Sequence, residues 1–417
     1  MLPRRVSLLS TIVVAWASGC APQSTPDDPT GVVLGISQNS TTPSTPQNTT
    51  PTSGGTSNGA SATPSSPAAD NQTISGRLTG SAAVRLFDLG ASAAGDEWVV
   101  SDVGTGLTSS AFVLVLFDEN DDMLMRQVVV PGAPLRHVMR AATNNARLGL
   151  TPLPGSGGGD FRFQIARNAA QAIPAAHAQV VWLNFGAGSD VRIQHRAGVS
   201  FTAFDGAKLG SSYAGTTQRI KSSIVSAMRA DYTAYQMEIR TSDEGPPPSG
   251  AYSTVYFGGY DPSLLGLADT VDSYNQADGQ SAIVYVDTFA LYETMQLTPE
   301  QMGLMIANVA SHELGHLLGL YHTRDPNDLM DTTGTAWDLA EDQAFSRALL
   351  EQSVFPSGYE NCPTLLTQTL GLRSDATKRL ATSRAAKTPM HALIRRLTDL
   401  ELHYACGSCS AINDLPR

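Results

Sequence analysis

The stretch "SHELGHLLGLYH" (311–322) places three histidines, one glutamate and two glycines within twelve positions. His312 and His316 are four residues apart, so on a helix they lie one turn above each other on the same face. Gly319 suits the left-handed position at which a helix ends and the chain turns sharply. Such a turn can bring His322 back toward the same point, so the stretch predicts three imidazoles in one place.

The residues before this stretch predict the helix itself. Thr298 can cap its first turn, Pro299 suits the first helical position, and Gln301 lies three residues after the cap. Apolar residues then recur at helical spacing, namely Met302, Met305, Ile306, Val309 and Ala310. This periodicity predicts that one face of the helix packs against a core.

Three imidazoles on one ion leave a fourth position open for water, which is the arrangement of a catalytic zinc rather than a structural one. Zinc lowers the pKa of such a water to about 7, so hydroxide becomes available near neutral pH. Glu313 lies about a quarter turn from the two helical histidines. From there its carboxylate can reach the bound water, take its proton and pass it to a leaving amine.

The alternative interpretation is an ordinary buried helix that happens to carry histidines. The five fixed residues of H-E-x-x-H-x-x-G-x-x-H arise by chance in roughly one chain in 10⁵ of this length and composition. Three buried histidines without a metal would also need three sets of hydrogen-bond partners. Both arguments favour the metal site.

Residues 312–322 match the extended zinc motif of the metzincin metalloproteases, and the chain resembles the matrixins within that group. Metzincins also have a downstream methionine turn, and "PNDLMDTTG" (326–334) supplies Met330 eight residues after His322. The resemblance implies that His312, His316 and His322 bind zinc, that Glu313 is the general base, and that Met330 forms the floor of the metal site.

Matrixins carry a second, structural zinc bound by further histidines, but this chain has no histidine between residues 196 and 311. We therefore expect a single zinc. Four oxygen-bearing residues of "LADTVDSYNQADG" (267–279) could gather around Ca²⁺, namely Asp269, Asp272, Asn275 and Asp278. An acidic surface loop is the favoured interpretation, because nothing in the spacing sets a calcium geometry.

The fold class that we predict is α+β and multidomain. Residues 74–176 are strand-like throughout and predict an antiparallel β-sandwich. "AFVLVLFD" (111–118) and "MLMRQVVV" (123–130) are expected to form a hairpin through the polar residues 119–122. "ARLGLTPL" (146–153) and "DFRFQIAR" (160–167) are expected to pair through "PGSGGG".

Strands and helices alternate over residues 177–356, which predicts a metzincin-like α/β catalytic domain. Strands are expected at 178–185, 235–241, 252–259 and 281–289, and a helix at 216–232. Residues 340–355 are expected to be a further helix. A helical C-terminal extension is predicted for 357–417, with one helix over 388–404.

The first residues have the features of a signal peptide (1–19): Arg4 and Arg5 precede the apolar run "VSLLSTIVVAWA" (6–17). "ASGC" (17–20) resembles a bacterial lipobox, in which Cys20 would be acylated, while Ala15-Trp16-Ala17 suits ordinary signal peptidase. Residues 20–73 are rich in Ser, Thr, Pro and Asn, a composition typical of a disordered tether. We expect an exported lipoprotein at the outer membrane or cell surface, with secretion as the alternative.

Export makes disulfides permissible, and a lipidated Cys20 would leave Cys362, Cys406 and Cys409. One disulfide from Cys362 to either Cys406 or Cys409 is predicted, with a Cys406–Cys409 bridge as the alternative.

The net charge of −11, with only 27 Lys and Arg in 417 residues, argues against nucleic acid as a partner. The function that the sequence predicts is an exported zinc metalloendopeptidase, a hydrolase acting on proteins or peptides, with a lipid anchor through Cys20. The competing hypothesis is a non-catalytic surface binding or adhesion lipoprotein with a vestigial metzincin domain. Retention of Glu313 favours the enzyme.

Overall fold

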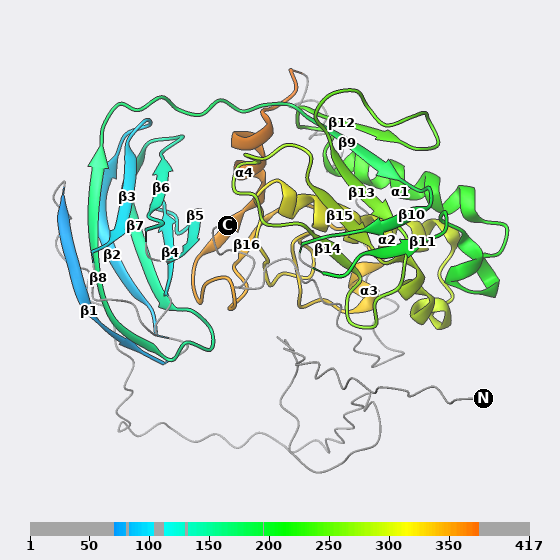
Figure 1. The fold of residues 1–417 in the computed structure, drawn as a ribbon, viewed down its shortest axis with the longest axis horizontal. Coiled ribbons are helices and arrows are strands. Elements are labelled where there is room, and N and C mark those ends of the chain that lie inside the picture. Colours follow the sequence, from blue (N-terminus) through cyan, green and yellow to red (C-terminus); the bar gives the residue numbers. More distant parts are fainter. Residues whose placement is uncertain (1–70, 81–82, 104–111, 130–131, 195, 375–417) are drawn as a thin grey trace, which may run out of the picture. The chain divides into compact units, whose positions relative to one another are not determined.

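Two antiparallel sheets form the first part of the fold in the computed structural model, which describes residues 71–80, 83–103, 112–129, 132–194 and 196–374. The first sheet has the strand order β1-β8-β3-β6 and the second β2-β7-β4-β5 (Figure 1). The strands are β1 (Gln72–Thr79), β2 (Arg85–Ser92), β3 (Glu97–Asp102), β4 (Phe112–Phe117), β5 (Met123–Val128), β6 (Leu135–Val138), β7 (Thr143–Pro152) and β8 (Gly158–Asn168).

The two sheets enclose one core, to which alternate residues of their strands contribute. β4 has the sequence FVLVLF, in which every side chain is buried. Phe112, Leu114 and Leu116 point into the core between the sheets, whereas Val113, Val115 and Phe117 belong to a second cluster on the outer face of the second sheet. A strand buried on both faces explains why this segment is a continuous apolar run instead of an alternating pattern.

The hairpin predicted for 111–118 and 123–130 is confirmed, because β4 and β5 pair antiparallel. The predicted pairing of 146–153 with 160–167 is wrong, although both segments are strands. β7 pairs with β2 and β4, and β8 pairs with β1 and β3. The glycine-rich loop carries the chain from one sheet to the other, so the two strands face each other across the core.

A five-stranded central sheet follows, with the order β12-β9-β13-β15-β14. Four of its strands are parallel, and β14 runs antiparallel to β15 at one edge. The strands are β9 (Gln179–Asn184), β12 (Met237–Thr241), β13 (Ser253–Phe257), β14 (Gly266–Ala268) and β15 (Ser281–Val284). The four longer ones fall within the predicted segments, and the prediction of a mixed α/β fold is confirmed.

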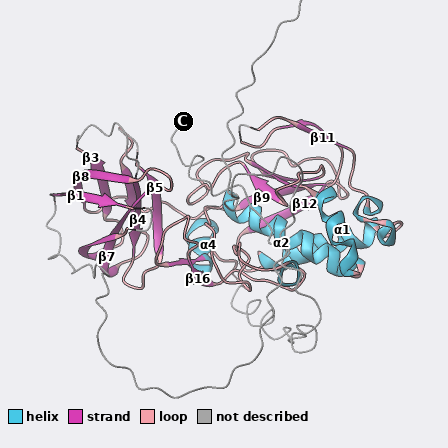
Figure 2. Ribbon diagram, turned by 90° about the horizontal axis from the view of Figure 1, so that it is seen from below, coloured by secondary structure: helices cyan, strands magenta, loops and turns pink. Residues whose placement is uncertain are grey.

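Helices α1 (Thr217–Asp231) and α2 (Pro299–Leu317) lie side by side (Figure 2). Their apolar faces share a core with β9, β13 and β15, so they cover one face of the central sheet. Side chains of β10 (Gly188–Val191) and β11 (Val199–Phe201) pack with Leu267 and Ile283 on the opposite face. Three 3-10 helices complete this region: η1 (Gly206–Leu209), η2 (Ser211–Tyr213) and η3 (Val286–Met295).

Two short hairpin strands stand where a helix was predicted. Residues 340–355 contain β16 (Arg347–Leu349), which pairs antiparallel with β17 (Tyr359–Asn361). The helical prediction for 340–355 is therefore wrong. Tertiary contacts override the local preference here, because Leu350, Val354 and Phe355 are buried in the cluster on the outer face of the second sheet.

The remaining helices are α3 (Ala336–Leu339) and α4 (Cys362–Leu370). The predicted helix over 388–404, Cys406, Cys409, the signal peptide, Cys20 and the tether to residue 70 lie outside the described residues. Within the described residues, no helix combines the length and apolar character that a membrane span requires.

Candidate metal centre

The three predicted ligand histidines lie together in the interior of the protein. The Nε2 atom of His316 is 3.1 Å from Nε2 of His312 and 3.2 Å from Nε2 of His322. All three side chains are buried, with at most 5% of their surface exposed. Among the described residues, these histidines form the one cluster of at least three potential metal ligands.

A turn at Gly319 brings the third histidine to the other two. α2 ends at Leu317, and Gly319 has a φ of 93°, which is the left-handed conformation that glycine adopts readily. A Cβ atom at this position would lie 2.7 Å from backbone atoms of Asp272, Ser273 and Tyr274. Both the conformation and the close approach of the neighbouring backbone require glycine here.

Backbone carbonyl groups orient two of the three imidazoles. Nδ1 of His312 lies 2.7 Å from the carbonyl oxygen of Leu329, and Nδ1 of His316 lies 2.7 Å from that of Leu320. A carbonyl oxygen can only accept, so each Nδ1 carries the proton and donates it. The lone pair of each Nε2 is then available to a metal, and such hydrogen bonds are the usual second shell of ligand histidines.

Burial keeps these imidazoles neutral near neutral pH. It lowers the pKa of His312 to about 4, and the hydrogen bond to Leu329 opposes this shift only in part. Burial also lowers the pKa values of His316 and His322 well below the ordinary value, and the neighbouring histidines lower them further. Neutral imidazole is the form that binds a metal ion.

The donor set and its spacing fit zinc. Two nitrogens bound tetrahedrally at the usual Zn–N distance are about 3.3 Å apart, close to the 3.1 and 3.2 Å between the Nε2 atoms. The Nε2 atoms of His312 and His316 both carry a lone pair and lie 3.1 Å apart, so both could bind one cation placed between them. Imidazole nitrogen suits zinc and does not suit calcium or magnesium.

Glu313 follows His312 on α2 and is almost completely buried. Its carboxylate lies against the backbone of β14, because a Cβ atom on Gly266 would be 2.5 Å from Oε1 of Glu313. β14 is the last strand of the central sheet. The carboxylate therefore lies between the helix that carries two candidate ligands and a strand that, among the described residues, has a strand partner on one side only. Gly266 was not predicted from the sequence, because a glycine at the start of a short strand has no distinctive pattern.

Met330 is fully buried beneath α2. A Cβ atom on Gly315 would lie 2.6 Å from its Sδ atom, so the absence of a side chain at Gly315 makes room for the methionine. The backbone N–H of Thr323, the residue after the third histidine, donates to the carbonyl oxygen of Met330 at 2.8 Å. The methionine turn and the third histidine are thus joined directly.

Asp328 holds this turn and was also missed by the sequence analysis. Its carboxylate accepts hydrogen bonds from the backbone N–H of Met330 and from the hydroxyl of Thr323, and its other oxygen accepts from Ser346. Burial raises the pKa of Asp328 to about 6, although these hydrogen bonds favour its ionised form. An aspartate two residues before a methionine was the available signal, but aspartate is common in turns.

Three of the four residues considered for calcium form hydrogen bonds within the loop or to segments beside it. Asp269 accepts hydrogen bonds from the backbone N–H groups of Gln194 and Ser281, and Asp272 accepts one from Ala277. Asn275 donates to the side chain of Gln179. The side chains thus hold loop segments in place, which agrees with the favoured interpretation of an acidic loop.

Cys362 is a free, fully buried thiol at the start of α4. Its Sγ atom is 4.0 Å from Oδ1 of Asp328, and burial raises its pKa well above the ordinary value. A disulfide to Cys406 or Cys409 would have to reach into this core, and it stays a prediction.

Comparison with known proteins gives one family match, the matrixin family, over residues 189–343. No curated protein gives a significant match to the chain. Among solved structures, archaemetzincin from Methanopyrus kandleri is similar over 49% of this chain and 96% of its own, with 15% identity and a TM-score of 0.23.

Two other similar structures cover a smaller part of the chain. PliG, a periplasmic lysozyme inhibitor of Aeromonas hydrophila, matches 25% of this chain and 94% of its own, with 13% identity and a TM-score of 0.21. The pre-peptidase C-terminal domain of a Bacillus anthracis collagenase matches 27% of this chain and 100% of its own, with 16% identity and a TM-score of 0.20.

The matched region contains the helix α2, the three clustered histidines, Glu313 and Met330. Matrixins are zinc-dependent metalloproteases of the metzincin group. Residues 189–343 of this chain therefore match the matrixin family.

Proposed function

We propose that the protein is a zinc-dependent endopeptidase with Glu313 as its general base. The observation that carries the proposal is the convergence of three Nε2 atoms, those of His312 and His322 lying within 3.2 Å of that of His316, inside the region that matches the matrixin family. His312, His316 and His322 would hold the zinc. When bound there, zinc supplies Lewis-acid chemistry, which polarises a peptide carbonyl and acidifies water.

Glu313 would move the proton in this reaction. Its carboxylate would take a proton from the attacking water and give it to the nitrogen of the leaving amine, which keeps the overall charge balanced. The position of Glu313 supports this role, since it lies one residue from a ligand and is shielded from solvent.

We propose that an extended peptide binds along β14. This strand ends the central sheet, so one of its edges has no strand partner among the described residues. A peptide strand added at such an edge gains main-chain hydrogen bonds. Gly266 of β14 lies against Glu313, so the peptide would pass close to the general base.

The test compares Glu313→Gln with the parent chain. We expect the variant to lose casein hydrolysis by about 10²–10⁴-fold, the usual contribution of general acid–base catalysis, while zinc content stays near one per chain. Glu300→Gln is the matched control, because Glu300 lies on the same helix but is exposed and paired with Arg219. Hydrolysis by Glu313→Gln at the parent rate, or hydrolysis by the parent that a chelator does not affect, would overturn the proposal.

A further inference from the structure

The outer face of the second sheet is covered by residues of the region that matches the matrixin family and of the segment that follows it. Phe117 of β4 and Phe355 pack edge to face, with ring centroids 5.5 Å apart. They belong to a buried cluster to which both regions contribute; the sandwich supplies Val113, Val115, Phe117, Met123 and Val128, and the rest is Val271, Tyr321, Leu350, Val354 and Phe355. The described residues lie in a single compact unit. The sandwich and the later part of the fold therefore share a core.

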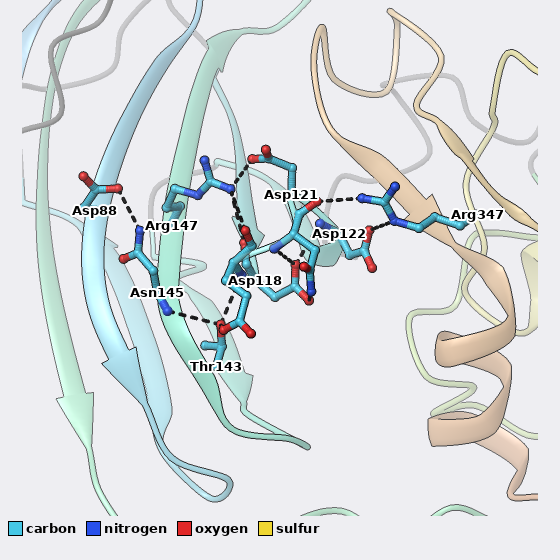
Figure 3. A network of polar contacts seen from close by, with 10 residues as sticks. Asp88, Asp118, Asp121, Asp122, Thr143, Asn145, Arg147 and Arg347 are labelled. Carbon is cyan, nitrogen blue, oxygen red and sulfur yellow. Dashed lines mark hydrogen bonds and ion pairs between the residues drawn. The ribbon is translucent and has the colours of Figure 1, made fainter.

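Polar contacts join the tip of the β4–β5 hairpin to the β16–β17 hairpin (Figure 3). The carboxylate of Asp122 accepts hydrogen bonds from Nε of Arg347 and from the side chain of Asn361. Arg347 also donates to the carbonyl oxygen of Asn120. The backbone N–H of Tyr359 donates to the carbonyl oxygen of Asp121 at 2.9 Å. Backbone and side-chain groups thus both contribute to the contact between the two hairpins.

The hairpin tip also forms contacts within the sandwich. Oδ1 of Asp118 accepts hydrogen bonds from the backbone N–H groups of Asn120 and Asp122. Arg147 of β7 pairs with the carboxylate of Asp121 (Figure 3). Asp122 therefore belongs to a loop whose backbone and side chains also make contacts within the sandwich.

The β16–β17 hairpin is hydrogen-bonded to the segment that contains His322. The backbone N–H of Glu351 donates to the carbonyl oxygen of His322 at 2.9 Å. The backbone N–H of Arg324 donates to the carbonyl oxygen of Leu349 at 3.0 Å. Buried Glu360 of β17 accepts the N–H of Tyr321 at 3.0 Å. The residues on both sides of His322 are thus hydrogen-bonded to this hairpin.

A second contact from the sandwich reaches the same place. Arg126 of β5 is buried, and its guanidinium lies 5.4 Å from the ring centroid of Tyr321. Its Nε donates to the carbonyl oxygen of Val354 at 3.0 Å. Arg126 therefore joins the sandwich to the residue that precedes His322 and to the loop between β16 and β17.

We propose that the β-sandwich is an intramolecular partner of the metal site, and that its β4–β5 hairpin positions His322 through the β16–β17 hairpin. His312 and His316 are held by α2, but His322 follows the end of that helix and depends on the chain segments around it. The partner that fits this face of the sandwich is a segment of the same chain. Asp122, Arg126 and Arg347 are then positioning residues for the metal ligand.

The test compares the full-length Asp122→Asn variant with the parent chain. Asparagine keeps the size of the side chain but removes the charge that Arg347 binds. We expect the zinc dissociation constant, measured by competition with a chelator, to rise about 10-fold or more, as for other residues that orient metal ligands. The visible absorption spectrum of the Co²⁺-substituted protein should also change, since it reports ligand geometry.

Asp160→Asn is the matched control. Asp160 lies on β8 of the first sheet and forms an exposed pair with Arg77, so its removal should leave zinc affinity and the Co²⁺ spectrum unchanged. If Asp122→Asn does not fold, Arg347→Gln removes the same ion pair from the more exposed partner. It should give the same rise in the dissociation constant.

A merely structural role would have a different signature. It would lower the unfolding temperature of the metal-free variant, but the zinc dissociation constant and the Co²⁺ spectrum of the folded variant would equal those of the parent. This result would overturn the proposal. The proposal rests on the proposed zinc site but not on catalysis. A parent chain that binds zinc without cleaving protein would contradict the proposed function alone.

Discussion

At the scale of single residues, the sequence singled out the three histidines, Glu313 and Gly319. Imidazole can bind a metal, a carboxylate can take a proton, and only a residue without a side chain fits the sharp turn readily. The partners that orient the imidazoles were not identifiable. His312 and His316 donate to the backbone carbonyl groups of Leu329 and Leu320. Every residue type has that carbonyl group, so no sequence pattern marks these partners.

Replacement of Gly319 should most directly disrupt the turn that brings His322 to the other two histidines. Gly319→Ala combines a strained backbone conformation with overlap against the backbone of residues 272–274. We expect the free energy of unfolding of the metal-free protein to fall by about 2–4 kcal/mol, since a left-handed non-glycine residue costs 1–2 kcal/mol and overpacking adds to it. Urea denaturation measures this change.

Gly215→Ala serves as the control for that substitution. Gly215 also has a positive φ, of 75°, but no atom lies within 4 Å of the Cβ position. Its replacement should lower the free energy of unfolding by only about 1 kcal/mol. Equal losses for the two variants would show that the overlap at Gly319 has no effect.

At the scale of elements, periodicity predicted the long helices and strands, and capping residues predicted where α2 begins. The error at 340–355 has a physical cause. "AEDQAFSRALLEQSVF" contains good helix formers, yet β16 gains pairing with β17 and burial of Leu350, Val354 and Phe355 against the sandwich. Helix propensity differs by less than about 1 kcal/mol per residue among ordinary residues, so tertiary burial outweighs it.

The start of α2 gives a prediction at this scale. The hydroxyl of Thr298 accepts the N–H of Gln301, and the side chain of Gln301 accepts the N–H of Thr298. Thr298→Ala should lower the free energy of unfolding by about 1 kcal/mol. Thr298→Ser keeps the capping oxygen and should restore most of this loss. If the serine and alanine variants give the same urea midpoint, the cap does not stabilise the helix.

At the scale of the whole molecule, the sandwich contacts the later part of the fold through residues far apart in the chain. Asp122 and Arg347 are separated by 225 positions. Neither residue differs, in its local sequence, from an ordinary surface charge. Contacts over such distances do not affect periodicity or spacing. The sequence therefore predicted the sandwich but not what it contacts.

His137 of β6 gives the prediction at this scale. It is buried beside Tyr274, which lies in the loop between β14 and β15 of the central sheet. Burial, together with the charge of nearby Arg140, lowers the pKa of His137 to about 3. The unfolded chain has the ordinary value near 6.5. Below pH 6.5 the unfolded state therefore binds a proton that the folded state excludes. The stability that depends on neutral His137 is complete above pH 6.5 and is lost as the pH falls toward 3.

We expect the parent to lose stability relative to His137→Gln by up to about 1.4 kcal/mol per pH unit between pH 6 and 4. Urea denaturation of both metal-free proteins across this range measures the difference, and the titration of the three ligand histidines cancels in the comparison. Parallel stability curves for the two proteins would show that His137 becomes protonated in the folded state.

The sequence by itself determined the ligand types, the helix that carries two of them and the glycine turn after it, because these depend on spacing and local conformation within about 25 residues. Only the tertiary structure decided which strands pair, where Asp328 and Gly266 lie, and that the sandwich packs beside the third histidine. These features depend on the burial of surfaces that distant segments share. The free energy of such burial becomes apparent only when the segments are in contact.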